Sequence, residues 1–153
     1  MTESMCLGHV QSMIPRCPDA VETVLAGYPP ACAARLRAVR ALIFAVARDL
    51  AGSGAVHETL KWGQPSYVVK TGTPLRLGIG ASGEPALLVH CQTTLIAQAR
   101  DMFSDVLTFE GHRAICLSVE RDLPEVPLRQ VIRWALTYKV RTAVSDRYRS
   151  PAD

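Results

Sequence analysis

The sequence predicts an α+β fold, a two-layer domain in which an antiparallel sheet of about five strands packs against N-terminal and C-terminal helices. Changes in hydrophobic period support this prediction. Apolar residues recur at three- and four-residue steps over residues 31–51 and again from residue 128, whereas the middle of the chain holds short alternating or β-branched segments. Because helical segments flank the antiparallel run, this order favours α+β packing over a wound βαβ sheet. A length of 153 residues suits one domain.

Two helices are expected before the sheet. Asp19 is a candidate N-cap for a short helix over residues 20–26, which ends before the two prolines of Gly-Tyr-Pro-Pro. Pro30 suits the first position of a longer helix that continues over residues 31–51. The apolar stripe of this longer helix is Leu36, Val39, Ile43, Val46 and Leu50.

The middle of the chain is expected to form strands, with one helix among them. Turn sequences such as Thr-Gly-Thr-Pro and Ser-Gly-Glu-Pro separate the first three strands, which indicates an antiparallel meander. The expected strands are residues 66–70, 75–81, 86–91, 106–109 and 114–119. A helix is expected from Thr93 or Thr94 to Phe103, and a last one follows Leu-Pro-Glu-Val-Pro and reaches about residue 144.

Composition excludes some classes of protein. Apolar residues make up 48% of the chain and charged residues 20%, which is ordinary for a globular protein. We expect no membrane segment, because no apolar run approaches the roughly 20 residues of a spanning helix. The net charge of +3 is well short of a dedicated nucleic-acid binder, so a nucleic-acid partner is not expected. The five cysteines form no CxxC pair and the first residues resemble no secretory signal, so we expect a cytoplasmic protein.

The segment from His57 to Val69 holds the main candidate binding site. Its aromatic side chains could stack on a planar or apolar ligand while the Lys61 ammonium meets an anionic group. We expect a ligand-binding cleft lined by Lys61, Trp62, Gln64, Tyr67 and, from the last helix, Tyr138. In the alternative interpretation Trp62 fills the space between sheet and helix, Lys61 points into water and Tyr138 lies at the edge of the core.

Other residues suggest chemistry less strongly. Glu58 could act as an acid or base beside Trp62, but more simply it accepts a hydrogen bond from a nearby arginine or backbone amide. His112 and Cys116 could share one face of a strand, yet a buried cysteine on a strand is more often a small apolar residue than a metal ligand. We expect no metal site and no catalytic residue, since no motif of hydrolases, nucleotide-binding proteins or calcium-binding proteins is present.

Three motifs resemble the YdhG-like family, a group of mostly uncharacterised domains. They are ETLKWGQPSY (residues 58–67), LTFEGHRAI (residues 107–115) and ALTYK (residues 135–139). The resemblance implies a YdhG-like domain over residues 18–146, an N-terminal extension over residues 1–17 and a C-terminal tail over residues 147–153. It also implies a frataxin-like arrangement, with terminal helices on an antiparallel sheet.

The expected function is small-ligand binding by a cytoplasmic protein of this family, without a predicted cofactor. The resemblance also brings an alternative, because one branch of the family is described as frataxin-like iron chaperones. Sites for hard iron ions rest on clustered carboxylates, whereas the acidic residues of this chain are scattered. A homodimeric interaction module is the third possibility.

Overall fold

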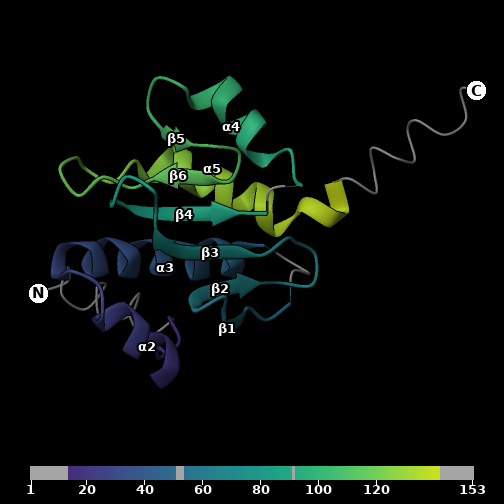
Figure 1. Cartoon of the computed structure of the whole chain (residues 1–153). Helices are drawn as coiled ribbons and strands as arrows, with labels where there is room; N and C mark the ends of the chain where they lie inside the picture. Colours follow the sequence, from purple (N-terminus) through teal and green to yellow (C-terminus); the bar gives the residue numbers. More distant parts are fainter. Residues whose placement is uncertain (1–13, 51–53, 91, 142–153) are drawn as a thin grey trace, which may run out of the picture.

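The computed structural model describes residues 14–50, 54–90 and 92–141, in which helices combine with one sheet (Figure 1). In chain order the elements are α2 (Asp19–Ala26), α3 (Pro30–Asp49), β1 (His57–Lys61), β2 (Gln64–Val68), β3 (Leu75–Ile79), β4 (Pro85–Val89), α4 (Leu95–Phe103), β5 (Thr108–Glu110), β6 (Ala114–Cys116) and α5 (Glu125–Leu136). The predicted α+β class is confirmed.

The sheet has six strands in the order β1-β2-β3-β4-β6-β5, and all neighbours are antiparallel. The sequence did not predict β1, which forms one edge. All but one of its residues are exposed, so it lacks the alternating apolar pattern by which a half-buried strand is found. It is a strand because it pairs along its whole length with β2, from His57 opposite Val68 to Lys61 opposite Gln64.

Side-chain alternation gives the sheet two different faces. On one face Tyr67, Leu75 and Leu87 are fully buried, and α3 and α5 lie behind this face in Figure 1. The residues between them, such as Arg76 and Leu88, lie on the opposite face and are half-buried. In Figure 1 the viewer looks onto this opposite face, and none of the described helices crosses in front of it.

The helices differ from expectation at their ends. Asp19 is not an N-cap, because Pro18 holds that position. Asp19 is the first helical residue, where its negative charge interacts favourably with the positive end of the helix dipole. The last helix begins earlier than predicted, at Glu125, and α5 ends at Leu136; the expected end near residue 144 lies outside the described residues. Across the described ranges, no helix combines the length and the apolar character needed to cross a membrane.

The loop between β2 and β3 holds the C-terminal end of α5. Thr71 Oγ1 donates a hydrogen bond to Leu136 O at 2.7 Å, and the Thr73 amide donates to Ala135 O at 2.9 Å. A Cβ on Gly72 would lie 2.5 Å from Ala135 O, so only glycine fits between these bonds. The loop therefore satisfies carbonyl groups that a helix end would otherwise leave unpaired.

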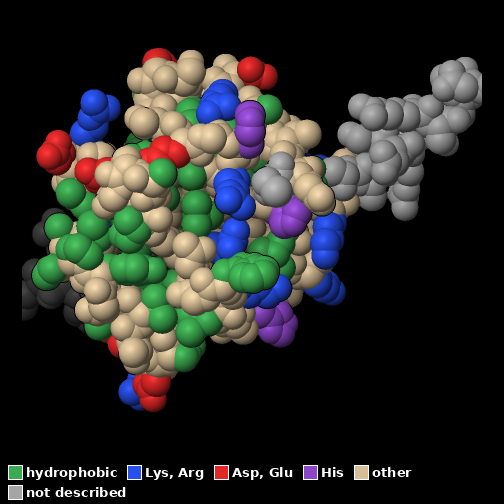
Figure 2. Space-filling model, viewed as in Figure 1, with side chains coloured by type: hydrophobic (Ala, Val, Ile, Leu, Met, Phe, Trp, Pro, Cys, Tyr) green, Lys and Arg blue, Asp and Glu red, His purple; other side chains and the backbone are tan. Residues whose placement is uncertain are grey.

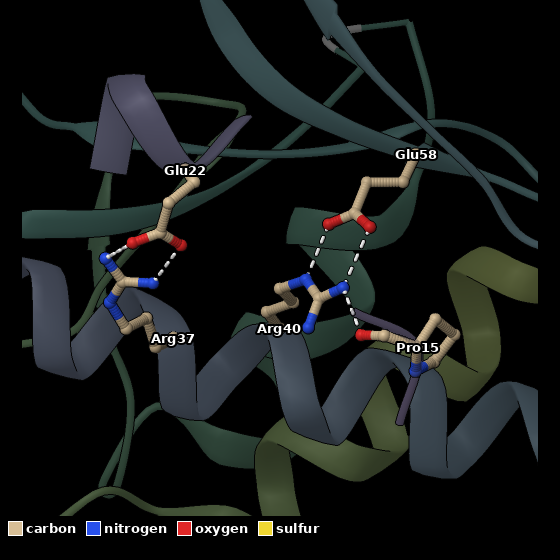
Figure 3. Close-up of polar contacts among 5 residues, drawn as sticks. All are labelled: Pro15, Glu22, Arg37, Arg40 and Glu58. Carbon is tan, nitrogen blue, oxygen red and sulfur yellow. Dashed lines mark hydrogen bonds and ion pairs between the residues drawn. The ribbon is translucent and has the colours of Figure 1, made fainter. Parts of the chain in front are cut away.

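A buried ion pair joins β1 to the helical layer (Figure 3). Arg40 of α3 donates to both Glu58 oxygens, at 2.6 Å and 2.9 Å, and the two side chains are only 9% and 7% exposed. Arg40 also donates to Pro15 O at 2.8 Å, so part of the segment expected to be an N-terminal extension contacts α3. Of the two donors expected for Glu58, an arginine or a backbone amide, the structure shows the arginine.

We expect Arg40→Met to lower the free energy of unfolding by about 3–5 kcal/mol, because it leaves the Glu58 carboxylate buried without its partner. Arg37 of the same helix provides a matched control. It pairs with Glu22, but these side chains are 40% and 45% exposed, so Arg37→Met should change stability little. Urea unfolding of both variants measures the difference, and equal losses would contradict it.

Candidate functional site

The open face of the sheet contains two adjoining hollows. The first, of about 490 Å³, is called the Trp62 hollow and is lined by Lys61, Trp62, Pro74, Arg76, His90 and Arg113. The second, of about 420 Å³, is called the Gln64 hollow, and its lining includes Gln64, Leu88, Glu110 and His112. Arg76 and Arg113 line both hollows, so these two arginines form the boundary between them.

Positive charge gathers on this face. Figure 2 shows basic and histidine side chains in a band across the face of the sheet, while acidic side chains lie towards its margins. Lys61, Arg76 and Arg113 make no ion pair with any carboxylate in the described part of the chain, where the pairs are those of Arg37 and Arg40. The lining of the Trp62 hollow contains no acidic residue. An anion would therefore meet uncompensated positive charge there.

Trp62 occupies a turn position that a tryptophan rarely adopts. β1 and β2 are joined by the two-residue turn Trp62-Gly63, and both residues have positive φ, +56° and +73°. Positive φ at both positions is the sign of a type I′ hairpin turn, which favours Asn, Asp or Gly. For other L-residues this conformation costs roughly 1–2 kcal/mol. The indole is also 90% exposed, so core packing does not offset that cost.

Two glycines of the β3 segment make room for the polar side chains of the Gln64 hollow. A Cβ on Gly78 would lie 2.4 Å from Gln64 Nε2, and a Cβ on Gly80 would lie 2.7 Å from Glu110 Oε2. The Glu110 carboxylate is held in place, because it accepts hydrogen bonds from the Ala81 amide at 2.9 Å and from Ser82 Oγ. The Gln64 amide thus lies directly against the Gly78 backbone, and the fixed Glu110 carboxylate lies against Gly80.

The predicted cleft of five residues is corrected by the structure. Lys61 and Trp62 line the same hollow, and Gln64 lies in the adjoining one. Tyr67 is not part of either lining. It is three residues from Gln64 on a strand and therefore points to the opposite face, where it is fully buried and packs edge-on against Phe44 with ring centroids 6.0 Å apart.

The Tyr67 phenol is part of the core beside the ion pair. Burial, and then the neighbouring Glu58 carboxylate, raise the pKa of this phenol above its usual range. Tyr138 is half-buried against the core of the helical side, with the Arg141 guanidinium 5.8 Å from its ring centroid. The alternative in which Trp62 fills the space between sheet and helix is wrong too, because its indole is exposed.

The sequence did not predict that Arg76, His90 and Arg113 would line this site. A signal existed for Arg76, since a single arginine between Leu75 and Leu77 indicates a polar residue on the open face of a strand. His90 and Arg113 lie beyond the ends of β4 and β6, and only the register of those strands places them beside Arg76.

Comparison with family models, with curated proteins and with solved structures found no match for this chain. The resemblance to the YdhG-like family therefore stays a prediction. Among residues 14–50, 54–90 and 92–141 there is no group of three or more His, Cys, Asp or Glu side chains that could hold a metal ion. Iron binding and homodimer formation stay predictions as well, to be tested by ferrous titration and by light scattering.

Replacing Trp62 with Asn should stabilise the protein. Asn tolerates the left-handed conformation, so we expect the free energy of unfolding to rise by about 1 kcal/mol and the melting temperature by about 2–4 °C. Trp62→Ala is the control, because Ala keeps the unfavourable φ and should bring no such gain. Thermal unfolding measures both variants. A lower stability of Trp62→Asn would mean that the indole contributes to packing.

Proposed function

We propose that the protein binds a small organic anion that carries a flat ring, such as a nucleotide or an aryl phosphate, in the Trp62 hollow. The observation that carries this proposal is the exposed Trp62 at an unfavourable turn position beside three cations without carboxylate partners. Local strain that packing does not offset is often associated with a functional site. Stability gives no reason for an indole at this position, whereas ligand stacking does.

The chemistry of the hollow suits such a ligand in two ways. An indole face stacks on a flat ring, and stacking of a base on an aromatic side chain contributes about 1–3 kcal/mol. Arg76 and Arg113 present planar guanidinium groups that bind phosphate or carboxylate with paired, charge-assisted hydrogen bonds. Lys61 adds a mobile point charge at the rim. The ligand would thus be held by its ring and by its anion together.

The location proposed from the sequence is the cytoplasm. Free thiols at Cys17, Cys32 and Cys116 support it, because disulfides rarely persist in that reducing compartment.

Calorimetric titration with AMP, adenosine and inorganic phosphate tests the proposal. We expect AMP to bind at least about tenfold more tightly than either fragment, because it alone engages the indole and the arginines together. Its affinity should fall with added salt, since charge contributes to binding. If AMP and phenyl phosphate both fail to saturate the protein at millimolar concentration, the proposal is wrong.

Arginine variants locate the binding. Arg76→Gln and Arg113→Gln should each weaken AMP binding by about tenfold through loss of a charged hydrogen-bond donor. Arg129→Gln, at an exposed position of α5 in the helical layer, is the matched control and should bind as the parent protein does. Equal effects of all three would show that AMP responds to net charge and not to this site.

A further inference from the structure

The two hollows adjoin along a boundary that is itself cationic. Arg76 and Arg113 line both of them, so an anion bound between these arginines would have free space on either side. Across the sheet Arg76 lies opposite Leu88, and Leu88 lies opposite Ala114, the residue next to Arg113. Two strand spacings, about 10 Å, therefore separate the two arginine backbones, which their long side chains can bridge from opposite sides.

The two hollows differ in chemistry. The Trp62 hollow offers an aromatic face and cations. The Gln64 hollow offers the Gln64 amide, the His112 imidazole and the Glu110 carboxylate, which together supply hydrogen-bond donors and acceptors. Groups of this kind recognise the edges of nucleobases by hydrogen bonds, whereas an aromatic face binds any base by stacking.

Glu110 decides where the negative charge of the ligand can lie. Hydrogen bonds from Ala81 and Ser82 fix its carboxylate in the Gln64 hollow, so a second phosphate placed there would be repelled. A ligand with a chain of phosphates, such as ADP, would carry charge into this region. A ligand with one anionic group in its middle and an uncharged ring at each end fits both hollows.

Resting on the proposed function, we infer that the open face binds two nucleoside units joined by a single phosphodiester. One base stacks on Trp62, the phosphodiester lies between Arg76 and Arg113, and the second base lies in the Gln64 hollow with its edge towards the Gln64 amide, which covers Gly78, and towards Glu110. Glycine at position 78 belongs to this arrangement, because a Cβ there would displace the Gln64 amide. The ligand is either a free dinucleotide or one step of a single-stranded nucleic acid.

The test compares AMP, ADP, the dinucleoside monophosphate ApA and a hexanucleotide of adenosine by calorimetry on the full chain. ApA should bind at least about tenfold more tightly than AMP, and ADP no more tightly than AMP despite its larger charge. ApA no better than AMP, or ADP better than ApA, would overturn the inference and leave the proposed function standing. Failure of AMP to bind would overturn the inference, and failure of phenyl phosphate as well would overturn the proposed function too.

Variants of the second hollow give an independent readout. Gln64→Ala and Gly78→Ala should reduce the affinity for ApA to that for AMP while leaving the affinity for AMP unchanged. Thr108→Ala, at an exposed position of β5 outside both linings, is the control and should change neither affinity. If neither Gln64→Ala nor Gly78→Ala changes the ratio of the two affinities, the second base does not lie in the Gln64 hollow and the inference is wrong.

The hexanucleotide distinguishes the two sources of the ligand. Binding at least as tight as that of ApA, with amide NMR shifts that extend beyond the two hollows, identifies a single strand as the ligand. Tight binding of ApA with weaker binding of the hexanucleotide identifies a free dinucleotide, because the ends of the site would then exclude a longer chain.

Discussion

Side-chain alternation along the strands is the constraint on which the rest of this structure depends. Because successive residues point to opposite faces, Tyr67, Leu75 and Leu87 enter the core while Gln64, Arg76 and Leu88 emerge on the other side. The helices can bury only the apolar face, so the polar face stays open. A shift of one residue in the β2 or β3 register would exchange the two sets and destroy the core and the hollows together.

The buried ion pair of Arg40 and Glu58 connects this division to the candidate site. Glu58 lies on the core side of β1, and Lys61, three residues later, lies on the open side and precedes the turn that carries Trp62. β1 is an edge strand with little apolar surface, and it is attached by pairing with β2, by contacts with α2 and by the bond to α3. The hairpin that presents the indole is therefore held in part by this ion pair, so the stability of the core and the geometry of the open face are linked.

Much of the fold was accessible from the sequence because hydrophobic period reports directly on burial. The long helix α3, the β2–β4 meander and the start of the final helix followed from it with errors of a few residues. β1 was missed because an exposed edge strand has no apolar period. The predicted cleft failed at Tyr67 for a related reason: the segment was interpreted as one wall, although Gln64 and Tyr67 stand at odd separation on one strand. Arg113 could not be placed without the β4–β6 register, which the sequence does not reveal.

The distribution of charge explains how a chain with a small net charge can form an anion-binding site. A net charge of +3 gave no reason to expect an anionic ligand, because the total counts every acid and base alike. The fold pairs Arg37 and Arg40 with carboxylates on the helical side and leaves Lys61, Arg76 and Arg113 together on the open face. Glu110, which lines the second hollow, is fixed there by hydrogen bonds. Positive charge is therefore greatest near Trp62 and falls towards Glu110, and a ligand with its charge at one defined point fits that gradient better than one with charge spread along its length.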